Sequence, residues 1–212
     1  MVEPSVADSA QQRPGRKRCD RSRLSILSAA WELVSELGYA GLSVEGIAAR
    51  AGTGKQTIYR WWPSKADVLV DALTAKAGFH ATADLHIVLE DRGSYADDLR
   101  AFLRASLRLA RDPVMAGVLR TLMAQAQIDP SFGARFRDGF LQARREAVRV
   151  LVDRARDRGD LPTGQTSDTA ATVVFGVVWY EILAVGEAKP HRDEDLVDDL
   201  VALLAAPRHE PH

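Results

Sequence analysis

Two short helices joined by a glycine turn are the feature of this sequence that restricts its fold most strongly. Ser43 suits the N-cap of a helix over 44–51, because its side chain can accept a hydrogen bond from a free amide of the first turn. Gly52 is suited to end that helix, since glycine adopts the left-handed conformation at little cost. Residues 55–62 then have room for about two helical turns before Pro63 stops them. Elements this short need a third helix to pack against.

That third helix is predicted just upstream, where Ile26, Ala30, Leu33 and Leu37 recur at helical spacing on one stripe. Gly38 is predicted to end it. The three helices together match the helix-turn-helix plan, in which the last helix projects polar side chains outward.

The last short helix has a polar N-terminal end. Ile58 is its predicted inward anchor, while Lys55, Gln56, Thr57 and Tyr59 point outward. Such a helix can reach base edges and phosphates together, and its dipole favours phosphate at this end. The alternative without a role in DNA binding is that Tyr59 only covers apolar surface and that Lys55 is only solvated.

Charge is unevenly distributed along the chain. Residues 13–65 hold ten basic and four acidic side chains, a net charge of +6 that leaves −7 elsewhere. This pattern fits a phosphate-binding module on an acidic body, or simply a solvated charged face. Residues 1–12 are predicted to be a disordered leader and 13–23 a basic arm, which either contacts DNA or only aids solubility.

The rest of the chain also has helical periodicity and no repeat of fixed period. Ser64 is predicted to cap a helix that runs to about Ala81, and breaks containing Gly or Pro separate the later segments. The later predicted helices span 95–111, 113–127, 130–158, 166–187 and 193–205. The fold class is therefore all-α, with a domain at 24–73 and a larger helical domain at 74–212.

Composition excludes several other classes of protein. Cys19 is the only cysteine, so no internal disulfide can form. The N-terminus has no charged-then-apolar signal segment, and the apolar stretch 170–186 is interrupted and falls short of a membrane span. We therefore expect a cytoplasmic protein with no membrane partner.

The ordered set of motifs resembles the DNA-binding domain of the TetR family over nearly all of residues 24–73. The motifs are Gly38-Tyr39, Leu42-Ser43-Val44, Ile47-Ala48, Ala51-Gly52, Thr57-Ile58-Tyr59-Arg60 and Pro63-Ser64-Lys65. The resemblance implies a transcriptional regulator, usually a repressor, that binds a pseudo-palindromic DNA operator as a homodimer and is released by a small molecule. It implies an N-terminal three-helix helix-turn-helix domain and a C-terminal helical domain for ligand binding and dimerisation.

The resemblance also assigns roles to individual residues. Lys55 and Gln56 stand where the family reads bases, Thr57 and Tyr59 where it contacts phosphate and the adjoining base edge, and Lys65 where the next helix touches phosphate. The full predicted DNA-binding set is Thr53, Lys55, Gln56, Thr57, Tyr59, Arg60, Trp61 and Lys65.

Four positions depart from the family pattern. Gly54 replaces the usual Ser or similar cap of the recognition helix, and Thr53 replaces an apolar turn residue, which puts local stability in doubt. Trp61 and Trp62 stand where His-Phe is common. We expect Trp62 in the core and Trp61 along the backbone.

In the larger domain, the sequence predicts a dimer surface and a ligand pocket. The segment 173–180 is apolar nearly all round, and Leu196, Leu200 and Leu203 share one face of the last helix, so these two helices are the expected homodimer interface. The pocket candidates are Phe102, Met115, Leu119, Met123, Phe136, Phe140, Phe175, Trp179 and Glu181. The alternative is that these residues only form the hydrophobic core and contact no ligand.

Glu181 is the most informative polar residue of these candidates, because a buried charge is costly unless it is paired. We expect it to meet an arginine such as Arg104 or Arg108, to reach solvent, or to meet a polar or cationic ligand.

An enzyme is the competing class. No nucleophile constellation or Gly-rich phosphate loop is visible, and His80 with Asp84 is the only pair that resembles a metal site. We therefore expect no catalytic activity, cofactor or metal. A further alternative keeps DNA binding but leaves the larger domain only to dimerise or to bind a protein partner.

Overall fold

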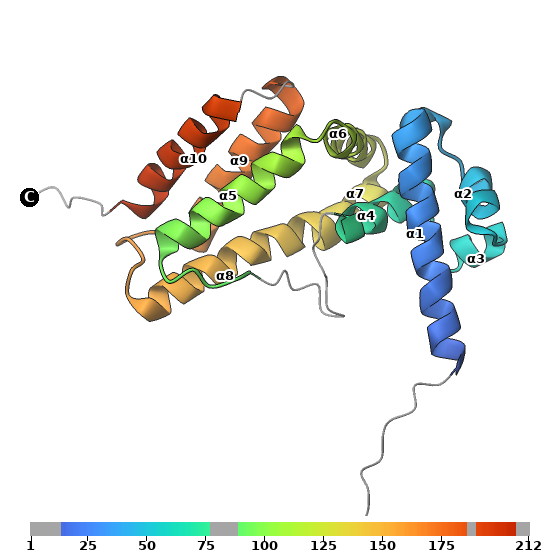
Figure 1. The fold of residues 1–212 in the computed structure, drawn as a ribbon, viewed down its shortest axis with the longest axis horizontal. Helices are drawn as coiled ribbons and strands as arrows, with labels where there is room; N and C mark the ends of the chain where they lie inside the picture. Colours follow the sequence, from blue (N-terminus) through green and yellow to red (C-terminus); the bar gives the residue numbers. More distant parts are fainter. Residues whose placement is uncertain (1–13, 77–88, 186–189, 207–212) are drawn as a thin grey trace, which may run out of the picture.

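The computed structural model describes residues 14–76, 89–185 and 190–206, and every regular element in these ranges is a helix. Figure 1 shows two groups of helices. The head consists of α1 (Pro14–Gly41), α2 (Val44–Ala51), α3 (Lys55–Tyr59) and α4 (Lys65–Lys76). The body consists of α5 (Tyr95–Arg111), α6 (Pro113–Ile128), α7 (Pro130–Phe136), η1 (Arg137–Leu141), α8 (Gln142–Arg158), α9 (Ser167–Tyr180), η2 (Glu181–Val185) and α10 (Pro190–Ala205). The predicted all-α class is confirmed.

The head is built on α1, against which α2 and α4 pack. Ile26 and Ala30 of α1, Ile47 of α2 and Ile58 of α3 are all completely buried. Leu37, predicted on the same stripe, is 56% exposed. That prediction is wrong because the chain leaves the helical path at the next residue, before another element covers this turn.

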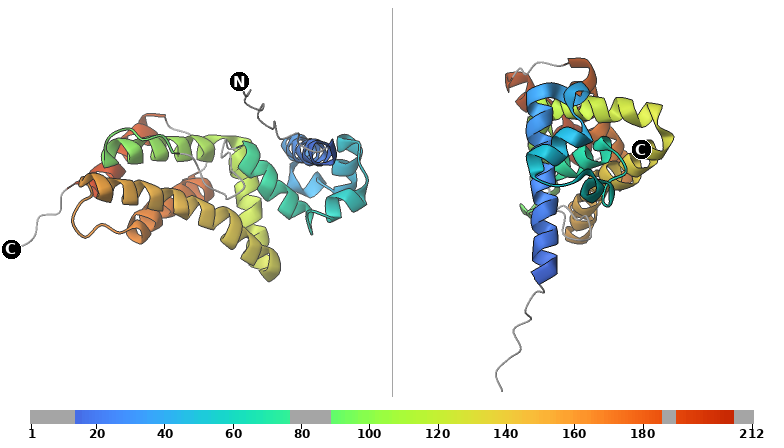
Figure 2. Two further views of the ribbon diagram at one scale, coloured as in Figure 1. Left: turned by 90° about the horizontal axis from the view of Figure 1, so that it is seen from below. Right: turned by 90° about the vertical axis from the view of Figure 1, so that its right-hand side faces the viewer.

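The first helix begins earlier and ends as expected. It starts at Pro14, so the described part of the predicted basic arm is helical, and Figure 2 shows this end of α1 reaching beyond the other head helices. Proline is favoured in the first turn of a helix and arginine is a good helix former. Gly38 has φ 67° and ψ 178°, which breaks the helix where the sequence predicts.

The body helices follow the predicted boundaries closely, because side chains mark their starts. Asp112 accepts a hydrogen bond from the Met115 amide at 2.8 Å and so caps α6. Asp129 caps α7 in the same way, at 2.9 Å from the Ser131 amide. The predicted helix 130–158 is continuous but contains the π-helical turn η1, and a second π-helical turn, η2, extends α9.

Two apolar clusters lie at opposite ends of the molecule. One unites the head with α6, α7 and η1, through residues such as Leu69 and Phe136. The other joins α5, α8, α9 and α10, through residues such as Leu99 and Leu151. The predicted domain boundary after residue 73 lies within α4, and α4 contacts both α6 and α7. Movement of α4 is therefore coupled to packing in the body.

Candidate nucleic-acid interface and ligand cavities

The turn between α2 and α3 has the geometry that the sequence predicts. The Ser43 side chain accepts a hydrogen bond from the Gly46 amide at 3.0 Å, and Gly52 lies in the left-handed region with φ 65°. The Thr53 amide then donates to the carbonyl of Ala48 at 2.9 Å, which closes the end of α2. Gly54 is extended and offers α3 no side-chain cap, as its replacement of the usual cap suggested.

α3 presents one buried face and one exposed polar face. Ile58 is completely buried, whereas Lys55, Gln56, Tyr59 and Arg60 are exposed. Thr53 and Thr57 are half-buried beside them. The exposed residues lie on consecutive turns of one short helix at the end of the head, where a groove of double-stranded DNA can reach them.

Lys55 is held by a neighbour within the head. Its ammonium lies 2.7 Å from a carboxylate oxygen of Glu45, and this hydrogen bond raises the lysine pKa. Both side chains are more than half exposed, and ion pairs of this kind contribute little to stability. Lys55 can therefore exchange Glu45 for a base or phosphate at low cost.

Lys65 has a structural partner that the sequence did not indicate. Its ammonium donates to the carbonyls of Tyr39 at 3.0 Å and Leu42 at 2.7 Å, and lies 4.2 Å from the centre of the Tyr39 ring. It thus satisfies backbone groups just beyond Gly38, where α1 ends. An ammonium has three donors, so one remains for a phosphate.

The two tryptophans differ in burial. Trp62 is buried and its ring nitrogen donates to Asp71 at 2.9 Å, while Arg23 meets the same carboxylate oxygen at 2.6 Å. Trp61 is half-buried and lies edge-on to Trp62, with the Arg60 guanidinium 5.1 Å from its ring centre. Trp62 in the core is confirmed.

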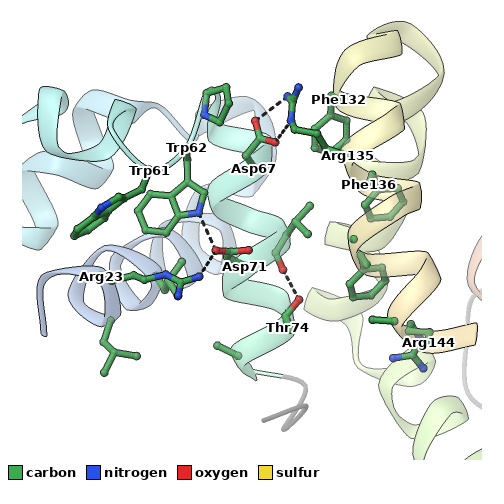
Figure 3. A pocket seen from close by; sticks show the side chains of 18 residues that line it. Arg23, Trp61, Trp62, Asp67, Asp71, Thr74, Phe132, Arg135, Phe136 and Arg144 are labelled. Atoms are coloured by element: carbon green, nitrogen blue, oxygen red, sulfur yellow. Dashed lines mark hydrogen bonds and ion pairs between the residues drawn. The ribbon is translucent and has the colours of Figure 1, made fainter. Parts of the chain in front are cut away.

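Two cavities adjoin the Phe140 ring. The inner cavity, about 30 Å³, lies between α4, α5, α6, η1, α8, α9 and η2 and is lined by five of the predicted pocket residues. These are Met115, Leu119, Phe140, Phe175 and Trp179. The groove, about 540 Å³, lies between the head and α7–α8, and Phe136 and Phe140 line it (Figure 3).

Three predicted pocket residues line neither cavity. Phe102 packs edge-on against Phe175 in the far cluster, and Met123 packs against the head-side cluster. Their helical spacing predicts an inward direction but not which neighbour fills the space, and a ligand contact by these two residues stays a prediction.

Glu181, the third, is bound by arginines other than those expected. It is 2% exposed and accepts from Arg111 at 2.6 Å and Arg192 at 2.8 Å, while Arg104 pairs with Glu194 instead. Burial disfavours its charge, but hydrogen bonds from Arg192 and Arg111 outweigh burial and lower the pKa of Glu181. The expectation that an arginine satisfies it is confirmed, with different partners.

Sequence reasoning missed Arg144, which lines both cavities. It is buried, its guanidinium donates to the Ser106 hydroxyl at 3.3 Å, and it lies 5.8 Å and 5.6 Å from the ring centres of Phe140 and Phe175. Burial lowers the pKa of Arg144 to about 10. Its spacing of four from Phe140 and seven from Leu151 would have placed it on the buried stripe.

Metal ligands do not gather anywhere in the ranges 14–76, 89–185 and 190–206. His80 and Asp84, the pair considered from the sequence, lie outside the described residues.

A helical head with an exposed polar helix after a glycine turn, joined to a larger helical body, defines a class of helix-turn-helix DNA-binding regulators. Family comparison agrees with this class. The profile described as "Bacterial regulatory proteins, tetR family" matches residues 26–72, and "Tetracyclin repressor-like, C-terminal domain" matches 89–204. The chain belongs to the TetR family of transcriptional regulators.

Similar proteins are also regulators rather than enzymes. The chain is 30% identical to the HTH-type transcriptional regulator YdeS of Bacillus subtilis (strain 168), over 90% of this chain and 91% of that protein. It is 23% identical to the HTH-type transcriptional regulator AqdR of Rhodococcus erythropolis, over 84% of each.

Solved structures share the fold. FadR from Bacillus subtilis, in complex with stearoyl-CoA, superposes with a TM-score of 0.63 at 20% identity, covering 88% of this chain and 99% of that one. The SmeT–triclosan complex gives 0.58 at 23% identity, covering 90% and 98%.

One helix of the body resembles a membrane span by length and composition alone. Ser167–Val185 is 19 residues long with a mean hydropathy of 1.5, values that a helix within a folded domain can also have. The stretch contains Glu181 with its two arginine partners, and the family is one of DNA-binding regulators. We therefore assign it to the body and not to a membrane.

Proposed function

We propose that this protein is a cytoplasmic repressor that binds a pseudo-palindromic operator as a homodimer and is released by a small hydrophobic or amphipathic molecule. The observation that carries the proposal is the exposed polar face of α3, held in place by the buried Ile58. α3 would enter the major groove of each half-site.

Within this interface the side chains have different tasks. Lys55 and Gln56, at the tip of α3, read base edges, while Thr57 and Tyr59 contact phosphate and the adjoining base. Thr53, Arg60 and Trp61 flank them along the backbone. Lys65 contributes its remaining donor to a phosphate.

Exposed apolar side chains on the last two helices support the homodimer. Tyr180 and Leu183 on α9–η2 are 61% and 54% exposed, and Leu203 on α10 is 67% exposed. Leu200, predicted on the same face as Leu203, is instead buried against the body. Both helices pack on α5, so their free faces lie on the body and away from α3. Sedimentation at micromolar concentration should show a dimer, and a monomer there would contradict this part of the proposal.

The inner cavity supports the ligand-release part of the proposal. Its volume of about 30 Å³ is far below the ~300–1,000 Å³ of small-molecule sites, so an effector must displace side chains to enter. Met115 and Leu119 line it from α6, and α6 contacts both α1 and α4 of the head. Opening the cavity would therefore shift the head and favour a conformation with lower operator affinity. FadR and SmeT, which share this fold, have been solved in complex with stearoyl-CoA and with triclosan.

The DNA-binding test begins with selection of bound duplexes from a random pool, followed by titration of the selected and a scrambled duplex over a salt series. Lys55→Ala should weaken the selected duplex about ten-fold or more and the scrambled duplex much less, because base contacts carry specificity. Arg149→Ala, an exposed change on α8, is the matched control and should bind like the wild type. Equal weakening of both duplexes by Lys55→Ala would refute its reading role.

A further inference from the structure

The groove between head and body is too large and too strongly lined by aromatic side chains to be packing space alone. We propose that it is a second small-molecule site, separate from the inner cavity, which takes an uncharged aromatic compound bearing one hydroxyl, amide or amine N–H. Binding there does not depend on the proposed function; only its effect on DNA affinity does.

Aromatic rings form one wall of the groove. Phe132, Phe136 and Phe140 stack along α7 and η1, with ring centres 5.8 Å and 5.4 Å apart and interplanar angles of 16° and 7°. Trp61 and Trp62 lie on the head side, across from this column (Figure 3). A flat ring that lies against the phenylalanine column gains aromatic contacts with it.

Charge in the groove favours an uncharged occupant. Asp67 is bound by Arg135, with N–O distances of 2.7 Å and 3.1 Å, and Asp71 is bound by Arg23 at 2.6 Å. Each carboxylate therefore already has its counter-charge. A cationic ligand would have to compete with the arginines for one of these carboxylates, whereas an uncharged ring leaves both pairs intact.

One polar atom remains to orient the occupant. Arg23 and Trp62 both donate to Oδ2 of Asp71, and within the described ranges Oδ1 of this carboxylate receives no hydrogen bond. A hydroxyl, amide or amine on the ligand can donate to Oδ1, which gives the aromatic body a fixed direction in the groove.

The size and position of the groove allow a bound molecule to affect the position of the head. Its volume of about 540 Å³ lies within the ~300–1,000 Å³ of small-molecule sites. Its walls belong to different parts of the molecule, α4 on one side and α7–α8 on the other. A bound ring would therefore hold α4 at one separation from the body.

The test uses N-phenyl-1-naphthylamine, an uncharged aromatic amine that fluoresces in apolar surroundings, with the full chain and no DNA. Gly139 lines the groove, and a Cβ built on it meets nothing within 4 Å, so Gly139→Phe is the variant chosen to fill the groove. Gly117→Phe on α6, where a Cβ also meets nothing within 4 Å, is the matched control away from both cavities. Leu119→Phe fills the inner cavity instead.

We expect Gly139→Phe to weaken probe binding about ten-fold or more, since it removes the binding volume, while the other two variants stay within about two-fold of wild type. If Gly139→Phe has lost its thermal unfolding transition, and therefore does not fold, Ala143→Phe replaces it in the test, because this variant fills the groove from α8. The proposal is overturned if the wild type does not bind the probe, if the groove variants bind like wild type, or if Leu119→Phe alone loses binding. A wild type that binds the probe but no duplex DNA would contradict the proposed function and leave this site standing.

Discussion

The far end of the body and the boundary between body and head are held together in very different ways. In the far end, α10 is tied to α5 by Arg100–Asp198, Arg104–Glu194 and Arg111–Asp193, and α8 is tied to α5 by Arg158–Asp98. Across the head–body boundary of the described ranges, Asp67–Arg135 is the only ion pair, and it lies beside the groove.

This difference identifies where the molecule can deform. Helices that share several ion pairs as well as a common apolar cluster move as a unit, whereas the head–body boundary has its apolar cluster and only one partly exposed ion pair, beside a groove. We therefore expect the body to stay rigid and the head to move relative to it, with α4 as the moving element.

The largest effect is expected in the body, at Glu181. Glu181→Gln leaves the buried Arg111 with less counter-charge, and breaking a buried pair should cost about 3 kcal/mol of unfolding free energy at pH 7. Because the folded pKa of Glu181 is lowered from 4.5, its contribution is present above about pH 4.5 and is lost as pH falls through the lower folded value. Denaturant unfolding at pH 7 and pH 3 should show the deficit shrinking in acid.

The matched control for this prediction is Glu194→Gln, which breaks a pair with both side chains about half exposed. It should leave the unfolding midpoint nearly unchanged. A deficit that is equal at both pH values, or equal in both variants, would rule out a buried charge as its cause.

Lys65 should give the next largest effect, within the head. Lys65→Met removes two charged hydrogen bonds to carbonyls and should cost about 1.5–3 kcal/mol of unfolding free energy. If its third donor also holds a phosphate, the dependence of log affinity on log salt should flatten by about 0.9. Lys76→Met, at the exposed end of α4, is the control. Unchanged stability would show that the carbonyl contacts contribute nothing.

A smaller effect is expected at the boundary itself. Arg135→Gln removes its one ion pair, and since Arg135 is 40% exposed the cost should be about 1 kcal/mol or less. Amide hydrogen exchange in α4 should nevertheless become faster. Arg145→Gln is the matched control, because Arg145 is also 40% exposed but pairs with Asp168 inside the body. Equal exchange of α4 in the two variants would argue against a mobile boundary.

The smallest effect is expected at the uncapped start of α3. Gly54→Ser should stabilise the head by a few tenths of a kcal/mol, because a serine side chain can cap the helix and Gly54 has open space around it. Thermal unfolding is the measurement, and Gly117→Ser in the middle of α6 is the comparison. Destabilisation by Gly54→Ser would mean that the turn requires glycine for another reason.

Local features of the fold were predictable because their causes lie within a few residues. Ser43 and Gly52 mark the ends of α2 through a side-chain hydrogen bond and a left-handed backbone angle, whereas α3 ends at Tyr59, before the predicted stop at Pro63. Lys55 and Ile58 took their expected faces because a helix of known start has a fixed periodicity.

Contacts between distant helices were not predictable in the same way. The position of Glu181 in an apolar helix indicated that its charge needs a partner, but it did not indicate which arginines reach it. Periodicity predicts which face of a helix is buried and not which helix packs against that face. The carbonyl contacts of Lys65 and the burial of Arg144 have the same origin. The groove arises from the angle between head and body, which no local pattern encodes.

The π-helical turn η1 determines how this part of the protein would respond to the loss of one residue. Residues four apart drift around an α-helix of 3.6 residues per turn, and the i→i+5 bonding of η1 takes up this drift so that Phe132, Phe136, Phe140 and Arg144 stay on one side. A π-helical turn holds one residue more than the α-helical turn it replaces, so removing one residue, such as Gly139, would let this turn become α-helical and leave the side chains of α8 facing as they do now. Relatives that lack this one residue should therefore still place the residue aligned with Arg144 beside both cavities.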